Sequence, residues 1–173
     1  MDKTDPPTGS EHGALCWELM RLADMPPGMV YAMAQLRSEI FVVEQACVFL
    51  DLDGSDDQAL HVLGSKHGEL VAYARCFGPG VKFAEASIGR IATRRQARGS
   101  GLGHLLVERA KTAIGTCWGV QAVRIGAQAR LRAFYQSHGF VDMCRPYLED
   151  GIDHLEMLWN PLKTQITGGQ HGT

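Results

Sequence analysis

The chain has 173 residues and a formal net charge of −2, which fits one domain whose core needs no disulfide or metal to stabilise it. The charge gives no strong attraction to nucleic acid or to an anionic membrane surface, and no apolar run approaches the length of a membrane-spanning helix. We therefore expect no nucleic-acid partner and no membrane partner.

The cysteines and the two ends of the chain set further expectations. Five scattered cysteines form no C-x-x-C pair, which argues against zinc sites and thioredoxin-type sites, so we expect free thiols and no metal. Residues 1–13 contain no apolar signal-peptide segment, and we expect a cytoplasmic protein. Residues 1–13 and 161–173 are expected to be flexible tails around one domain at residues 14–160.

Hydrophobic periodicity predicts the elements of this domain. In chain order we expect a strand at residues 15–22, a helix at 24–44, strands at 61–64, 70–77 and 87–93, a helix from 102 to near 119, a strand at 120–127, a helix at 131–138, and strands at 140–143 and 154–159. The residues expected on one face of the second helix are Leu102, Leu105, Leu106, Arg109, Ala110 and Ala113. The mixed order indicates an α+β fold with three α/β/α layers and argues against a doubly wound sheet.

The stretch Asp51–Asp57 (DLDGSDD) is a turn-rich acidic loop. Counted from its first residue, the sixth position holds Asp56, where a calcium loop needs glycine. We therefore interpret the loop as a solvated turn and not as a cation site. Arg75 and Arg90 lie in predicted strands, and the sequence leaves open whether they pair with acids or face a cleft.

A glycine-rich turn at residues 98–103 (RGSGLG) joins a predicted strand to a predicted helix. It lacks the Lys and Ser/Thr of a P-loop, and His104 stands where a dinucleotide-binding fingerprint needs its third glycine. Glycine leaves backbone N–H groups open to a ligand, and a helix N-terminus attracts anions. With Arg94, Arg95 and Arg98 nearby, the turn is predicted to bind a diphosphate; a flexible Gly/Ser loop is the alternative.

Two motifs in this half of the chain resemble those of the GNAT N-acetyltransferases. Residues 96–101 (QARGSG) match the Q/R-x-x-G-x-G/A signature of the family, and residues 134–140 (FYQSHGF) are similar to its F-Y-x-x-x-G-F element. Residues 36–45 (LRSEIFVVEQ) are similar to a helix of the ElaA-like subgroup, and the resemblance extends over residues 15–160. It implies the GNAT fold, in which a mixed central sheet holds acetyl-CoA between two splayed parallel strands.

The resemblance also implies which residues bind acetyl-CoA, the co-substrate. Strand backbone would bind the pantetheine amides, and N–H groups of the glycine turn would bind the diphosphate. The residues assigned in this way are Ile91, Ala92, Thr93, Gln96, Arg98, Gly99, Ser100, Gly101, Leu102, Gly103 and Phe134. Packing is the other interpretation of the phenylalanine.

The implied chemistry is direct acyl transfer to an amine in a ternary complex. A primary amine with a lysine-like pKa of about 10 is mostly protonated at neutral pH, so a base must remove a proton and an acid can protonate the departing thiolate. Tyr135 occupies the family's position for that acid. Glu44, His61, His154 and a water relay are alternatives for the base.

The acceptor is expected to be a small-molecule amine, with a protein amine as the alternative, and a homodimer is among the assemblies that the sequence allows. Two other functions on the same fold stay open. One is a non-catalytic acyl-CoA-binding or sensor protein. The other is an enzyme like the acyl-homoserine-lactone synthases, GNAT-related proteins that the FVVEQ run at residues 41–45 also resembles.

Overall fold

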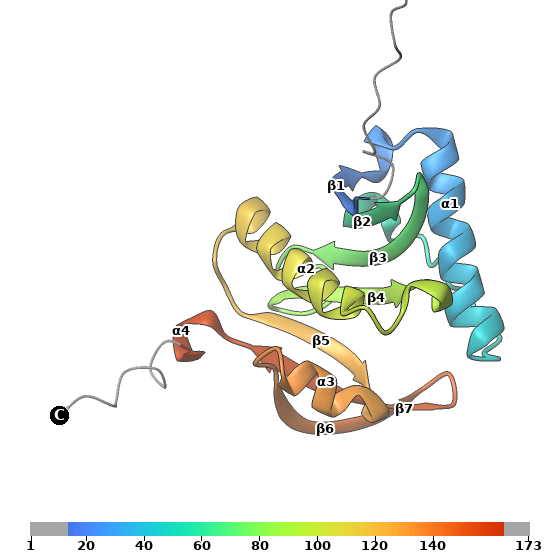
Figure 1. The fold of residues 1–173 in the computed structure, drawn as a ribbon. Coiled ribbons are helices and arrows are strands. Elements are labelled where there is room, and N and C mark those ends of the chain that lie inside the picture. Colours follow the sequence, from blue (N-terminus) through green and yellow to red (C-terminus); the bar gives the residue numbers. More distant parts are fainter. Residues whose placement is uncertain (1–13, 165–173) are drawn as a thin grey trace, which may run out of the picture.

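The computed structural model describes residues 14–164, which form a mixed sheet of seven strands with helices on both faces (Figure 1). The strand order is β1-β2-β3-β4-β5-β7-β6. The strands are β1 (Cys16–Arg21), β2 (Leu60–Lys66), β3 (Glu69–Phe77), β4 (Ala86–Thr93), β5 (Val123–Gln128), β6 (Val141–Glu149) and β7 (Ile152–Trp159). The helices are α1 (Pro27–Arg37), continued by a π-helical segment (Ser38–Glu44), α2 (Leu102–Trp118), α3 (Arg132–Gln136) and α4 (Pro161–Thr164). The predicted α+β fold is confirmed.

The ends of the chain lie partly outside this description. The expected tail at residues 1–13 and most of the one at 161–173 fall on residues that the structure does not describe. Pro161–Thr164 form the short helix α4, where a flexible tail was expected. No helix within residues 14–164 is both long and apolar enough to cross a bilayer.

The sheet separates two hydrophobic cores, which confirms the three layers. On one face α1 packs through Met33 and Leu36 against Tyr73 of β3. On the other face α2 packs through Leu106 and Ile114 against the central strands. Burial of these apolar side chains on both sides of the sheet supplies most of the driving force for folding.

The buried face of α2 differs from the prediction. Val107 and Ile114 are buried, whereas Leu105 is 50% exposed and Arg109 is exposed. The helix is rotated so that positions separated by four residues, such as Leu106 and Ala110, lie against the sheet. The predicted stripe was therefore wrong at two of its six positions.

The strands β4 and β5 are parallel and are paired only at Ala86↔Val123 and Ser87↔Arg124. Beyond these positions β5 turns away from β4 (Figure 1) and pairs with β7 instead. β4 also contains a bulge, because its register against β3 shifts and Arg90 has a φ of 52°. The expected pair of splayed parallel strands is confirmed.

The acidic loop is solvated only in part, so the prediction of a solvated turn was wrong for two of its aspartates. Asp51 and Asp56 are only 7% and 8% exposed. The fully buried Arg37 of α1 donates to both, with Nε–Oδ2 and Nη1–Oδ1 distances of 2.8 and 2.6 Å. The loop folds inward because a buried guanidinium without anions around it would be strongly destabilising.

The same carboxylates also bind the two strand arginines. Arg75 donates to Asp53 at 2.8 Å and to Asp56 at 3.0 Å, and Arg90 donates from Nε to Asp51 at 2.6 Å. We call these three arginines and three aspartates the Arg–Asp network. It joins α1, the acidic loop, β3 and β4.

Replacement of Arg37 tests how far this network stabilises the fold. Arg37→Met leaves two buried carboxylates short of a partner, so we expect the free energy of unfolding to fall by about 3 kcal/mol. Urea denaturation measures it. Arg109→Met on the exposed side of α2 is the control, with an expected change within about 0.5 kcal/mol. Equal, small effects of the two substitutions would contradict this account.

Candidate active site

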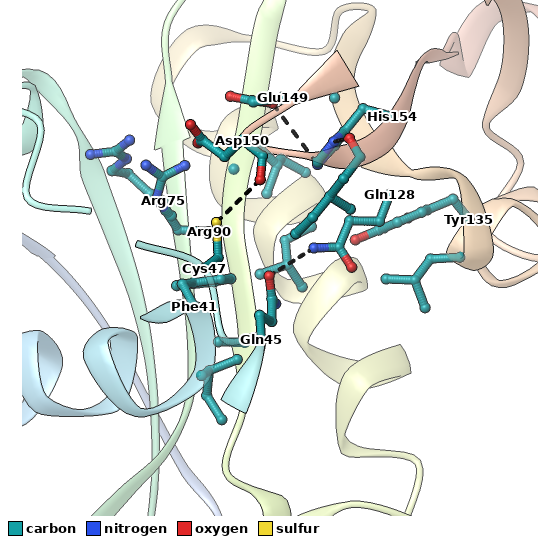
Figure 2. Close-up of a pocket in the computed structure, with 18 of the residues that line it drawn as sticks. Phe41, Gln45, Cys47, Arg75, Arg90, Gln128, Tyr135, Glu149, Asp150 and His154 are labelled. Carbon is teal, nitrogen blue, oxygen red and sulfur yellow. Dashed lines mark hydrogen bonds and ion pairs between the residues drawn. The ribbon is translucent and has the colours of Figure 1, made fainter. Parts of the chain in front are cut away.

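The gap between β4 and β5 opens into a cavity of about 590 Å³, a size typical of small-molecule sites. Figure 2 shows side chains from the π-helical segment, the central strands and the β6–β7 turn around it. Two hydrogen bonds connect its walls: Cys47 Sγ donates to the Asp150 carbonyl at 3.5 Å, and Gln128 Nε2 donates to Gln45 Oε1 at 3.0 Å. The cavity is therefore bounded by segments far apart in the sequence.

The glycine turn lies at the N-terminus of α2. Gly99 and Gly101 have φ values of 82° and 79°, and a Cβ built on either would meet nothing within 4 Å. Both backbones thus face open space in a conformation that glycine favours. The first N–H groups of α2, which begins at Leu102, have no acceptor within the helix. This geometry suits an anion such as a diphosphate.

The residues expected to bind coenzyme A fall into two groups. Six of them line the cavity: Ile91, Ala92, Thr93, Arg98, Gly103 and Phe134. The others do not line it: Gln96, Gly99, Ser100, Gly101 and Leu102. The serine hydroxyl donates to the Ala97 carbonyl at 3.0 Å and so supports the turn itself, while Gln96 is exposed.

Glu44 lines the cavity, but an arginine already binds its carboxylate. Arg98 donates to both of its oxygens, at 2.7 and 3.0 Å. This bidentate hydrogen bonding lowers the pKa of Glu44 below its ordinary value. A carboxylate held in this way is ionised but weakly basic, which makes it a poor proton acceptor.

His61 lies away from the cavity. Its fully buried ring is hydrogen-bonded to the Tyr73 hydroxyl at 2.8 Å and to the Asp56 carbonyl at 2.9 Å. Burial lowers the pKa of His61. Both ring nitrogens are thus occupied by internal partners, and the side chain has no contact with the site, contrary to our expectation of a base there.

Tyr135 lies on α3 with its hydroxyl pointing into the cavity beside Gln128 (Figure 2). The residue is 6% exposed, and its ring packs edge-on against Phe134 and Phe140. Burial raises the pKa of Tyr135 to about 12. The hydroxyl is therefore protonated at neutral pH and is able to donate its proton.

His154 on β7 lines the same cavity, a placement that the sequence left open. Its Nδ1 is 2.8 Å from the Ile152 carbonyl, so Nδ1 carries the hydrogen and the Nε2 lone pair is free to accept a proton. The ring stacks on Tyr147 at 5.5 Å. Tyr147 was not among the site residues expected from the sequence.

Gly126 of β5 provides the space for Tyr147, because a Cβ at this position would overlap the tyrosine hydroxyl. Burial, followed by the negative charge of Glu149, raises the pKa of Tyr147 to about 12. A glycine in a strand that contacts a tyrosine from a later strand has no local sequence signal. Only the pairing of β5 with β7, and of β7 with β6, brings the two together.

Comparison with known proteins adds independent findings. Residues 42–161 match the family model described as an acetyltransferase (GNAT) domain. Protein ElaA of Escherichia coli K12 is 38% identical over 143 residues, which cover 82% of this chain and 94% of ElaA. Both likenesses extend over the cavity and the glycine turn.

Comparison with solved structures agrees with the sequence comparisons. An acyl-CoA N-acyltransferase from Pseudomonas aeruginosa has a TM-score of 0.79 and 39% identity, covering 84% of this chain and 99% of that one. The E. coli ElaA structure has the same TM-score at 36% identity, covering 85% of this chain and 100% of ElaA. The acyl-homoserine-lactone synthase LasI, at 14% identity and a TM-score of 0.69 over 86% and 90% of the two chains, is similar in fold alone.

Alanine substitutions at two glycines of the α2 region test the turn. Gly101→Ala forces a positive φ on alanine, so we expect about 1 kcal/mol loss of stability and about tenfold weaker acetyl-CoA binding by calorimetry. Gly115→Ala lies within α2, where its Cβ meets only Val120 at 4.0 Å. This control should gain about 0.5 kcal/mol and bind acetyl-CoA normally. Unchanged binding in Gly101→Ala would argue against the turn as the diphosphate site.

Proposed function

This chain belongs to the GNAT acetyltransferase family, and we propose that it transfers the acetyl group of acetyl-CoA to the primary amine of a small molecule. Enzymes of this fold use an acyl-CoA co-substrate and an amine acceptor; the acetyl group and the size of the acceptor are our proposal. The observation that carries it is the Tyr135 hydroxyl in the cavity between the splayed strands, with the glycine turn nearby.

The described residues fit coenzyme A in two respects. From Gly89 onward, β4 has no pairing with β5, so polar backbone groups on that edge lack a strand partner and suit the amides of a pantetheine arm. The glycine turn offers unobstructed N–H groups to a diphosphate. We propose that Ile91–Thr93 bind the arm and that residues 98–103 bind the diphosphate.

Two side chains are proposed to move protons. His154 Nε2 accepts a proton from the ammonium form of the acceptor, whose nitrogen then attacks the thioester carbon. The carbon–sulfur bond breaks, and Tyr135 gives its proton to the departing sulfur. The attacking nitrogen gives its second proton to the tyrosine phenolate, and His154 releases its proton to solvent, so the products are an amide and free coenzyme A.

The geometry leads us to replace two earlier candidates for the base. The Glu44 carboxylate is bound by Arg98, and the His61 nitrogens are bound inside the protein. His154 has a free nitrogen facing the site where the amine must arrive. The hydrogen bonds across the cavity favour a small acceptor over an extended peptide. All five cysteines are free, which supports our proposal of a reducing cytoplasm.

Tyr135→Phe removes the proposed acid while keeping the ring that packs in the core. We expect kcat to fall between about 10- and 100-fold with little change in KM for acetyl-CoA. Steady-state rates of coenzyme A release measure this. Tyr31→Phe, at a position that is 72% exposed, is the matched control and should behave as wild type. A wild-type kcat in Tyr135→Phe would remove the residue from the mechanism.

His154→Asn tests the base by its dependence on pH. We expect kcat/KM to fall about 100-fold at pH 7 and to recover as pH approaches about 10, where the free amine predominates in solution. His67→Asn is the control, since this exposed residue lies in the β2–β3 turn with a φ of 53°, which asparagine tolerates. A pH profile of His154→Asn parallel to wild type would exclude His154 as the base.

A further inference from the structure

One end of the cavity is cationic. We call it the arginine end; it is lined by Phe41, Phe49, Asp53, Arg75, Lys82 and Arg90. None of these side chains takes part in the proton transfers proposed above. The residues at this end therefore indicate which second functional group the acceptor molecule carries besides its amine.

Arg90 is fixed in place and yet has unused donors. Its Nε is bound by Asp51 at 2.6 Å, and its guanidinium carbon lies 5.8 Å from the ring centre of Phe41 and 5.3 Å from that of Phe49. Neither terminal nitrogen has a hydrogen-bond partner among residues 14–164; the Asp53 carboxylate is 3.9 Å from Nη2. A guanidinium whose terminal nitrogens donate no hydrogen bond within the described residues is suited to a planar anion.

The surrounding charges leave an excess at this end. Three arginines and Lys82 face three carboxylates in and around the Arg–Asp network, which gives one uncompensated positive charge. Arg75, only 3% exposed, also keeps an Nε that has no hydrogen-bond partner within the described part of the chain. An additional monoanion would balance this end of the cavity.

Another wall of the cavity is acidic. Glu149 and Asp150, at the β6–β7 turn, line the same cavity, and Figure 2 shows both near its upper edge. Within residues 14–164, neither carboxylate has an arginine or lysine at ion-pair distance. The partner of Glu149 is the Nε2 of His154 at 3.9 Å, so the acidic wall adjoins the proposed base.

We infer that the acceptor is an amino acid in the broad sense, a molecule that carries a carboxylate as well as the amine. The carboxylate binds the terminal nitrogens of Arg90, and the ammonium group lies toward Glu149 and His154. A carboxylate is preferred to a phosphate because the guanidinium lies near two aromatic rings and the excess charge is single. This inference rests on the proposed function, because acetyl transfer is what makes the amine the reacting group.

Matched pairs of amines test the inference. Glycine, β-alanine and γ-aminobutyrate are compared with glycinamide, β-alaninamide and γ-aminobutyramide, with acetyl-CoA as donor and the acetylated product measured by mass spectrometry. In at least one pair we expect kcat/KM to be at least tenfold higher for the acid, because an amide offers no anion to the terminal nitrogens of Arg90. In Arg90→Gln that ratio should fall toward one.

Two further variants separate recognition from folding. Arg90→Lys keeps the charge without the planar group, so we expect a ratio between those of wild type and Arg90→Gln. Arg109→Gln on exposed α2 should keep the wild-type ratio. Thermal unfolding of each variant shows whether a lower rate reflects lost structure. The ratio of kcat/KM for the acid to kcat/KM for the amide, measured on one variant, does not depend on the folded fraction.

The outcomes distinguish this inference from the proposed function. Two results would overturn the inference and leave acetyl transfer intact. One is equal acetylation of acids and amides by the wild type, and the other is an acid-to-amide ratio in Arg90→Gln equal to that of the wild type. A preference for phosphoethanolamine over every acid would overturn the choice of carboxylate. Calorimetry measures binding of the acid in the presence of coenzyme A and does not depend on turnover. Arg90-dependent binding of an acid without acetylation of any amine would support the carboxylate site and contradict the proposed function.

Discussion

The divergence of β4 from β5 is the constraint on which the rest of the site depends. Two paired positions hold the strands together, and beyond them the edge of β4 has no neighbouring strand. Unpaired backbone groups are destabilising when they are buried, so the gap persists only because other contacts define each strand separately. β5 is held by β7, and β4 is held by β3 on its far side.

The Arg–Asp network keeps β4 in this position. It connects the bulge of β4, through Arg90, to the acidic loop and to α1. A cluster of buried charges is a weak source of net stability, but removal of one member leaves the others without compensation. The network thus resists rearrangement, and one of its members, Arg90, lines the cavity. In our proposal, stability of the fold and recognition of the acceptor share the same side chains.

The side of the cavity proposed to bind the acceptor is assembled from two distant parts of the chain. The π-helical segment contributes Phe41 and Glu44, and the β6–β7 hairpin contributes Tyr147 and His154. A wider helical turn changes the direction of successive side chains, and a tight hairpin sets which face each strand residue occupies. Both features are local irregularities, and the chemistry of the site lies next to them.

Local patterns in the chain were enough to predict the order of helices and strands, the glycine turn and the position of Tyr135, because periodicity and turn chemistry involve only near neighbours. They failed for the acidic loop, for His61, and for Leu105 and Arg109 on α2. The placement of Arg90, Tyr147 and His154 around one cavity came only from the tertiary structure, since strand register, one bulge and one missing Cβ decide which distant side chains meet. A shift of register by one residue would have turned each of them to the other face of the sheet.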